Sequence, residues 1–117
     1  MFTGIIQENG KISRIDNRSG KKHFSISCRK MQNDLKIGDS IACNGICLTV
    51  IEFNEDSITV EAMHETLIKT TAGYWSVNNS LHLEKAMLLS QRLDGHIVQG
   101  HIDTTSRLLY KNNIENT

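Results

Sequence analysis

The chain has 117 residues, with 13 basic and 13 acidic side chains and a formal net charge of zero. This length suits one domain with a hydrophobic core but not two ordinary domains. A neutral chain has no basic field that would attract nucleic acid or an anionic membrane, so we expect neither as a partner. A content of 38% hydrophobic and 22% charged residues is typical of a soluble globular protein.

The first residues, MFTGIIQENG, contain no basic segment and no long apolar run, so the sequence shows no signal peptide. No apolar stretch approaches the roughly 20 residues that a membrane-spanning helix needs. Three cysteines are an odd number, which suits a reducing compartment better than a disulfide framework. We therefore expect a cytoplasmic protein.

The N-terminal part predicts short strands separated by polar turns. Residues 5–15 form a strand-like run that Asn9-Gly10 interrupts, and the polar residues 16–22 predict a loop. Residues 23–28 alternate between apolar and polar side chains, as a half-buried strand does. Residues 35–39 then predict a turn.

Asn44-Gly45 is a strong hairpin signal, because a type I′ turn needs positive φ at both of its central residues. It predicts a hairpin between strands over residues 40–43 and 46–53. A further strand over residues 57–62 follows the polar turn at residues 54–56.

The remaining sequence predicts one more strand over residues 80–84 and a short helix over residues 85–93, ahead of Asp94-Gly95. Residues 103–110 begin another strand-like run before the polar residues 111–117. Many short strands with at most one or two short helices predict an all-β fold, either a small barrel or a sandwich.

The candidate metal ligands are three cysteines and three histidines, namely Cys28, Cys43, Cys47, His64, His96 and His101. Structural zinc usually takes closely spaced pairs such as Cys-x-x-Cys. Here Cys43 and Cys47 lie on either side of a predicted turn and no second pair follows, so we do not predict a metal site. For Cys28 and Cys43 we expect buried, apolar surroundings.

Cys47 lies in the predicted strand just after the turn, and Thr49 is the next residue on the same face. In one interpretation this thiol and this hydroxyl line a pocket together. In the other, both are small core residues of a barrel strand. The alternation pattern alone favours neither.

Two other stretches concentrate polar groups between apolar flanks. Residues 63–71 follow a predicted strand, and their Glu65-Thr66 pair either caps a helix, which is the default expectation, or presents a hydroxyl to a ligand. Residues 95–103 contain the dipeptide Gly-His twice, with His96 and His101. Glycine lets a backbone approach a planar ligand and histidine titrates near neutral pH, so this repetition favours a functional loop over two structural histidines.

Five motifs together resemble the N-terminal barrel of the riboflavin synthase α-chain family. They are MFTGII, GDSIACNGICLTV, ETLIKTT, LHLEKA and RLDGHIVQGHID, and they follow in the family's order and spacing across about residues 1–103. Each is modest by itself, but the set is highly specific. The resemblance implies a six-stranded Greek-key β-barrel with one or two short helices over residues 1–97, which binds a pteridine or flavin in a shallow pocket.

The family's enzymes convert two molecules of 6,7-dimethyl-8-ribityllumazine into riboflavin and 5-amino-6-ribitylaminouracil by moving a four-carbon unit. The resemblance therefore implies a transferase that acts in the final step of riboflavin biosynthesis. It implies no metal and no redox cofactor, because the C7 methyl of the substrate is acidic enough to form the carbanion. The protein supplies the orientation of two substrates and proton transfer.

Matching the family's motifs residue by residue implies the following ligand contacts: Gly4, Ile5, Ile6, Ser40, Cys47, Leu48, Thr49, Glu61, Ala62, Met63, His64, Glu65, Thr66, Gly100, His101 and Ile102. Thr66 corresponds to the position closest to the ring system. Cys47 and His101 are the implied catalytic residues, each as a nucleophile or as a proton-transfer group.

The family's chains carry two such barrels, and Thr3-Gly4-Ile5-Ile6 can be laid over Gln99-Gly100-His101-Ile102. We therefore expect residues 98–117 to begin a second, truncated repeat. A serine and an aspartate of the family's second barrel, which complete each active site with the first barrel of a neighbouring subunit, have no counterpart in this sequence. We expect the chain to bind ligand with impaired turnover, and to form a homo-oligomer, as a trimer like the family or as a dimer of single barrels.

The main alternative is a non-catalytic lumazine- or flavin-binding protein, because relatives of the family bind these molecules as optical antennae. Those proteins tend to lose groups such as Cys47 and His101, so their presence here favours the enzyme. A structural β-module without a ligand is a third alternative, which the number of matched pocket residues disfavours.

Overall fold

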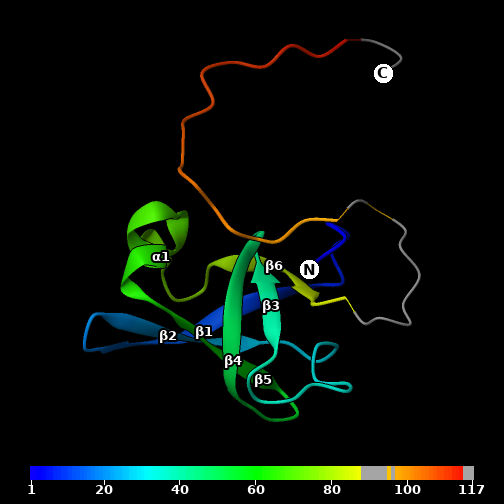
Figure 1. The fold of residues 1–117 in the computed structure, drawn as a ribbon, viewed down its shortest axis with the longest axis vertical. Coiled ribbons are helices and arrows are strands. Elements are labelled where there is room, and N and C mark those ends of the chain that lie inside the picture. Colours follow the sequence, from blue (N-terminus) through cyan, green and yellow to red (C-terminus); the bar gives the residue numbers. More distant parts are fainter. Residues whose placement is uncertain (88–94, 96, 115–117) are drawn as a thin grey trace.

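In this computed structural model, which describes residues 1–87, 95 and 97–114, six antiparallel strands close into a barrel (Figure 1). The strands are β1 (Glu8–Arg18), β2 (Lys21–Ser27), β3 (Ser40–Cys43), β4 (Ile46–Phe53), β5 (Ser57–Ala62) and β6 (Ser80–Lys85). Their order around the barrel is β1-β2-β5-β4-β3-β6. Short turns link β3, β4 and β5, and β6 returns beside β3, which is a Greek key. The fold implied by the resemblance is confirmed.

The hairpin between β3 and β4 forms at the predicted dipeptide. Asn44 and Gly45 have φ angles of 51° and 81°, so both central residues of the turn are left-handed. The Asn44 side chain also accepts a hydrogen bond from the backbone N–H of His82, at 2.7 Å, which ties the turn to β6. The predicted bounds of β3, β4 and β5 are confirmed.

β1 begins and ends three residues later than the predicted run over residues 5–15, and the expected break at Asn9-Gly10 is wrong. A Cβ atom on Gly10 would lie 2.5 Å from Ile26 Cγ2 and 2.7 Å from Leu83 Cδ1, so this glycine permits close packing inside a strand. The loop expected over residues 16–22 is also wrong. Residues 16–18 pair with β2, and the turn itself is only Ser19-Gly20.

The core fills the inside of the barrel with the inward-facing side chains of all six strands. On β5 buried and half-buried residues alternate, as the period of two requires. Phe24 and Trp75 meet edge to face, with ring centroids 5.1 Å apart. Cys28 and Cys43 are buried, as predicted. Burial raises the pKa of the Cys28 thiol to about 12 and raises that of Cys43 further above its usual range.

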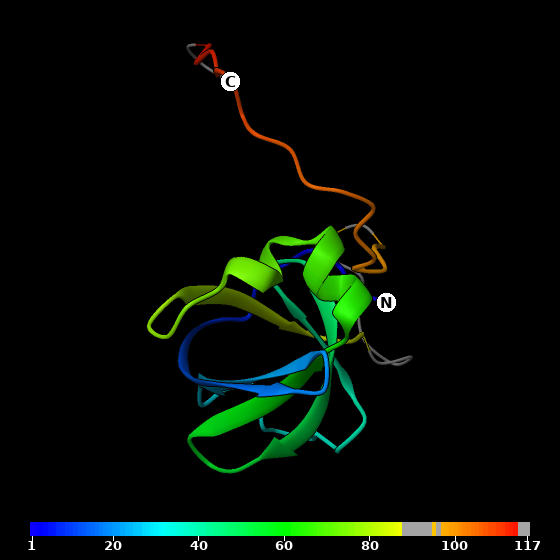
Figure 2. The same ribbon diagram turned by 90° about the vertical axis from the view of Figure 1, so that its left-hand side faces the viewer.

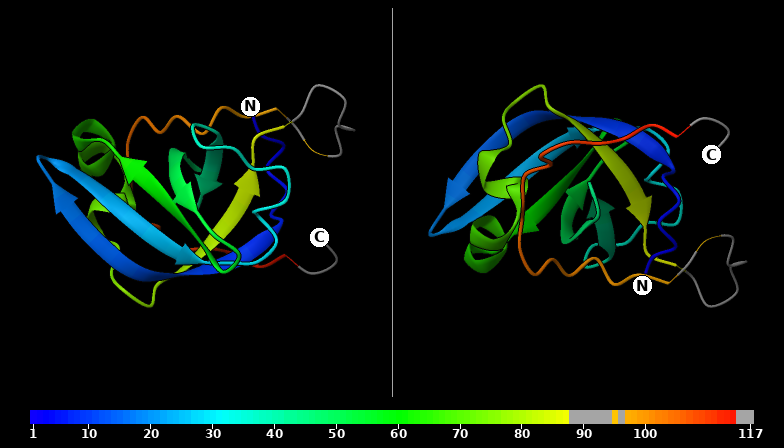
Figure 3. Two further views of the ribbon diagram at one scale, coloured as in Figure 1. Left: turned by 90° about the horizontal axis from the view of Figure 1, so that it is seen from below. Right: turned by 90° about the horizontal axis from the view of Figure 1, so that it is seen from above.

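Two short helices, α1 (His64–Lys69) and η1 (Thr71–Tyr74), follow β5 and lie together at one end of the barrel (Figures 2 and 3). Met63 occupies the N-cap of α1 without a side-chain hydrogen bond, so the expectation that Glu65-Thr66 caps the helix is wrong. Both residues lie inside α1. Thr70 is the N-cap of the second helix, η1, where its hydroxyl accepts a hydrogen bond from the N–H of Ala72 at 3.1 Å.

The chain beyond β6 differs from the prediction. Lys85 ends β6, and neither Ala86 nor Met87 is helical, so the beginning of the helix expected over residues 85–93 is wrong. Residues 88–93, Asp94 and His96 lie outside the described residues. Residues 103–110 are exposed, have no regular secondary structure, and leave the barrel (orange in Figure 1), so the strand-like run expected there is not a strand. In the described part of the chain, no helix has the length and apolar character to cross a membrane.

Candidate functional site

The outer face of β4 and its neighbours carries the first part of the site. Cys47 is half-buried on this outer face, whereas the next residue, Leu48, points into the core. Across the sheet Cys47 pairs with Ala42, and Ala42 pairs with Glu84. These three residues therefore form one row on the outside of the barrel, which the N-terminal segment and the segment around Gly100 cover.

The N-terminal segment is held at one end of this row by Glu84, whose side chain is buried. The Glu84 carboxylate accepts hydrogen bonds from the N–H of Thr3 at 2.7 Å, from the Thr3 hydroxyl at 2.8 Å and from the N–H of Gly4 at 3.0 Å. Charge-assisted hydrogen bonds of this kind are stronger than neutral ones. Glu84 thereby fixes the start of the MFTGII motif against β6.

Gly100 covers the other end of the row. The N–H of Cys47 donates a hydrogen bond to the carbonyl oxygen of Gly100 at 2.9 Å. Gly100 has a φ of +77°, and an added Cβ atom would lie 3.0 Å from Cys47 Cβ. Both the backbone conformation and the close approach therefore require glycine at this position.

A cavity of about 310 Å³ opens between the start of β4, α1 and the segment after Gly100. Figure 2 shows that segment, in orange, beside α1. The lining residues are Ile46, Cys47, Glu65, Thr66, Lys69, Thr70, Gly100, His101, Ile102 and Asp103. Six of them belong to the predicted ligand contacts, and they come from three separate segments of the chain: Cys47, Glu65, Thr66, Gly100, His101 and Ile102.

The cavity combines apolar walls with polar groups that are free to meet a ligand. Ile46 and Ile102 supply the apolar surface. Within the described residues, the Cys47 thiol, the Thr66 hydroxyl and the His101 ring make no hydrogen bond to the protein. The cavity can therefore hold a flat, partly apolar molecule and offer it a thiol, a hydroxyl and an imidazole.

One ion pair borders the cavity. Lys69 Nζ lies 2.6 Å from Glu65 Oε1, one helical turn earlier on α1. Their mutual hydrogen bond, reinforced by charge attraction, lowers the pKa of Glu65 and raises the pKa of Lys69. Both side chains are thus held in their charged forms.

The sequence model of the lumazine binding domain matches residues 3–86. The chain belongs to the lumazine-binding domain family. A riboflavin synthase of Actinobacillus pleuropneumoniae is 44% identical over 108 residues, which is 92% of this chain and 50% of that protein. The chain thus spans about half the length of the curated relatives it matches.

Solved structures of LumP share the fold. LumP complexed with 6,7-dimethyl-8-(1′-D-ribityl)lumazine has a TM-score of 0.77 and 25% identity, over 89% of this chain and 58% of LumP. LumP complexed with riboflavin has a TM-score of 0.67 and 27% identity, over 84% of this chain and 56% of LumP. The lumazine-binding domain described here therefore resembles proteins crystallised with both ligands.

Three other matched positions of this lumazine-binding domain lie away from the cavity, although they share the outer face of the barrel. Ser40 pairs with Thr49, and Thr49 pairs with Glu61. Cys47 and Thr49 both face outward, so the alternative that both are core residues is wrong, yet only Cys47 lines the cavity. Glu61 binds His23 instead, with 2.8 Å between Oε2 and Nε2. Their role as ligand contacts stays a prediction.

The remaining matched positions lie in the barrel core or on the protein surface, outside the cavity. Leu48 and Ala62 are buried in the core, whereas the side chains of Ile5, Ile6 and Met63 are exposed. His64 is exposed at the start of α1, and Gly4 is bound by Glu84. A lumazine-binding role for these residues also stays a prediction.

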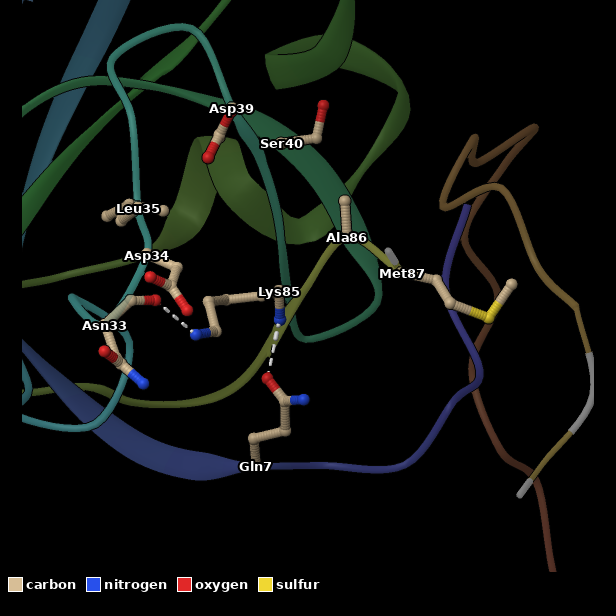
Figure 4. A pocket seen from close by; sticks show the side chains of 9 residues that line it. All are labelled: Gln7, Asn33, Asp34, Leu35, Asp39, Ser40, Lys85, Ala86 and Met87. Carbon is tan, nitrogen blue, oxygen red and sulfur yellow. Dashed lines mark hydrogen bonds between the residues drawn. The ribbon is translucent and has the colours of Figure 1, made fainter. Parts of the chain in front are cut away.

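A second cavity, of about 370 Å³, contains Ser40 and shares no lining residue with the first (Figure 4). Its polar groups already bind one another. Lys85 Nζ donates to the carbonyl oxygen of Asn33 at 2.7 Å, and the N–H of Lys85 donates to Gln7 Oε1 at 2.9 Å (Figure 4). It is the weaker candidate, because neither Cys47 nor His101 lines it.

Four lining residues were missed by the sequence analysis: Ile46, Lys69, Thr70 and Asp103. Helical spacing could have found Lys69 and Thr70, because they lie three and four residues after Thr66 on one face of α1. Over the ranges that the structure describes, no group of three His, Cys, Asp or Glu side chains could hold a metal ion.

Proposed function

We propose that this chain is the N-terminal half-site of a riboflavin synthase and binds 6,7-dimethyl-8-ribityllumazine or riboflavin in the cavity between β4, α1 and residues 100–103. One observation carries the proposal. Cys47, Thr66 and His101 come from three different motifs of the resemblance and line one cavity. The LumP complexes with the same two ligands support it.

The shape and chemistry of the cavity suit part of a pteridine or flavin ring. Its volume of about 310 Å³ is at the lower end of ordinary ligand cavities, as a shallow pocket that covers one side of a ring should be. Ile46 and Ile102 offer apolar contact to the ring faces, and the Thr66 hydroxyl can hydrogen-bond a ring carbonyl or nitrogen.

Two lining residues carry the proposed chemistry. The His101 imidazole is suited to take a proton from the C7 methyl of the lumazine, because a neutral imidazole has one ring nitrogen that can accept a proton. Cys47 is the only cysteine that is not buried, so its thiol can reach a bound ring as a nucleophile or as a second proton-transfer group.

We infer that the 117-residue chain by itself binds ligand but turns over slowly. The reaction needs two lumazine molecules in fixed relative orientation, and orientation can supply about 7–11 kcal/mol of a reaction barrier. The described residues bring only one such set of Cys47, Thr66 and His101 together.

Incubation of the purified chain with 6,7-dimethyl-8-ribityllumazine, followed by riboflavin fluorescence, tests this proposal. We expect saturable binding with turnover far below that of the full-length relative from Actinobacillus pleuropneumoniae measured in parallel. Turnover at the relative's rate would contradict the half-site, and absence of binding would contradict the function.

We also infer self-association and a cytoplasmic location. Exposed apolar side chains gather where the N-terminal segment pairs with the segment around Val98, at Ile5, Ile6 and Ile97, and a second barrel packed there would cover them. Sedimentation that finds only monomer would exclude a dimer or trimer. All three cysteines are free thiols, which suits a reducing compartment.

A non-catalytic lumazine-binding protein is the second candidate, and the likeness to LumP, crystallised with the lumazine, supports the ligand binding that it requires. The two candidates differ in what Cys47 and His101 do. If the protein is enzymatic, Cys47→Ala and His101→Gln lower residual turnover more than they lower ligand affinity. If it is a carrier, there is no turnover to lose.

A further inference from the structure

Lys69 is a lining residue of the candidate cavity to which no motif assigned a role. It lies in the last turn of α1, and it borders the same space as Cys47 and His101. Its side chain is half exposed, so the ammonium group remains accessible to a bound molecule. Its interaction with Glu65 uses one of its three N–H donors and leaves two.

The charged and titratable groups around Lys69 come from every element that borders the cavity. Glu65 lies on α1, Cys47 on β4, and His101 and Asp103 on the segment after Gly100. Among the described lining residues, Lys69 is the only permanently cationic side chain. The pair with Glu65 keeps the ammonium charged and holds it at the cavity.

We propose that Lys69 is a ligand-binding residue that stabilises the anionic, deprotonated form of the pteridine in this cavity, an inference that rests on the proposed function. When the C7 methyl loses a proton to solvent, the electron pair of the broken C–H bond delocalises into the ring toward the pyrimidine carbonyl oxygens, and no other bond changes. An ammonium group beside the ring attracts the anion more strongly than the neutral ring. It therefore lowers the pKa of the bound ligand.

The position of Lys69 indicates that it contacts the ring of the ligand and not the far end of the ribityl chain. Lys69 shares its cavity with Cys47 and His101, the two residues proposed to act on the reacting ring. A lysine at the far end of the ligand would instead recognise a terminal phosphate, as in flavin mononucleotide. The two positions predict different responses to substitution.

The test is an absorbance titration with pH of 6,7-dimethyl-8-ribityllumazine bound to the full 117-residue chain. We expect Lys69→Met to raise the pKa of the bound ligand by roughly 0.5–1 unit, and Lys69→Arg to restore most of the shift. Glu65→Gln should lower the pKa of the bound ligand, because this substitution removes a negative charge that lines the cavity. Lys11→Met, at an exposed lysine on β1 outside the cavity, is the matched control and should leave it unchanged.

Affinities for riboflavin and flavin mononucleotide, measured on the same variants, separate the possible failures. If the wild-type chain binds none of the ligands, the proposed function and the role of Lys69 are both overturned. If it binds them and Lys69→Met leaves the bound lumazine's pKa unchanged, only the role of Lys69 is overturned. A selective loss of flavin mononucleotide affinity without a pKa change would also overturn it, because it would place Lys69 at the phosphate.

Discussion

Phe2 and Val98 exchange both of their backbone hydrogen bonds. The N–H of Phe2 donates to the Val98 carbonyl at 2.7 Å, and the N–H of Val98 donates to the Phe2 carbonyl at 2.8 Å. Figure 3 shows the N-terminal segment beside the segment that contains residue 98 in both views. In the sequence overlay these residues stand at equivalent positions, just before Thr3-Gly4 and Gln99-Gly100.

Such a reciprocal contact between equivalent residues is what a two-fold relation between repeats produces. Gly4 and Gly100, the next equivalent pair, are also alike, with φ angles of 85° and 77°. Both observations support a second repeat that begins at residues 98–117. This second repeat stays a prediction.

Gly100→Ala should weaken ligand binding while leaving the barrel folded. A left-handed alanine costs about 1–2 kcal/mol, and its Cβ atom would press on Cys47, so the segment after Gly100 should leave β4. His101 and Ile102 would leave the cavity with it. We expect riboflavin affinity, measured by fluorescence quenching, to fall about tenfold or more.

Gly20→Ala is the control for this experiment. Gly20 is also left-handed, with a φ of +84°, but no atom lies within 4 Å of the added Cβ. Gly20→Ala should therefore introduce a similar backbone strain and leave the affinity for riboflavin unchanged. Equal affinity losses in the two variants would contradict the role of the Gly100–Cys47 contact.

Glu84→Gln should destabilise the protein by about 1–3 kcal/mol. The amide keeps one acceptor oxygen where the carboxylate has two, so one of the donors on Thr3 and Gly4 loses its partner. Urea unfolding measures the loss. Glu52→Gln, at an exposed glutamate of β4, is the matched control, and an equal effect there would show that Glu84 does not anchor the N-terminal segment.

Thiol alkylation should distinguish the three cysteines. Iodoacetamide should modify Cys47 in the folded protein and leave Cys28 and Cys43 intact, because the latter two are buried and their thiols stay protonated. Saturating riboflavin should slow the modification of Cys47. Mass spectrometry of peptides reports each site. Equal modification rates at the three cysteines of the folded protein would contradict the burial of Cys28 and Cys43. Absence of protection of Cys47 by riboflavin would contradict the proposed site.

The buried thiol of Cys43 should make the protein less stable at alkaline pH. Its pKa is raised by burial from 9.0, so above about pH 9 the unfolded chain loses this proton while the folded chain keeps it. Stability then falls by about 1.4 kcal/mol per pH unit for this one group. We therefore expect the stability advantage of wild type over Cys43→Ala to be constant from pH 7 to 8 and to shrink above pH 9. Urea unfolding at each pH measures it, and an advantage that stays constant to pH 11 would contradict this account.

The parts of the fold that the sequence predicted correctly depend on local signals. Asn44-Gly45 fixed the β3–β4 hairpin, because few dipeptides tolerate two left-handed residues. Asn9-Gly10 misled for the opposite reason. Gly10 is required because Ile26 and Leu83 pack against its Cα, where a side chain would clash. Both residues are distant in sequence, so no local pattern reveals this contact.

The site was predictable only as motifs and not as a cavity. The family's motifs named Cys47, Thr66 and His101, but the sequence could not show that Thr49 and Glu61, on the same outer face as Cys47, lie outside the cavity. Asp103 was missed because only the fold places the segment after Gly100 beside α1. Such proximity arises from the tertiary fold.

A crystal structure of this chain with riboflavin tests the central claim most directly. We predict the flavin ring between β4 and residues 100–103, in contact with Cys47, Thr66 and Ile102. A ring bound instead in the second cavity, against Gln7, Asn33 and Lys85, would contradict the claim.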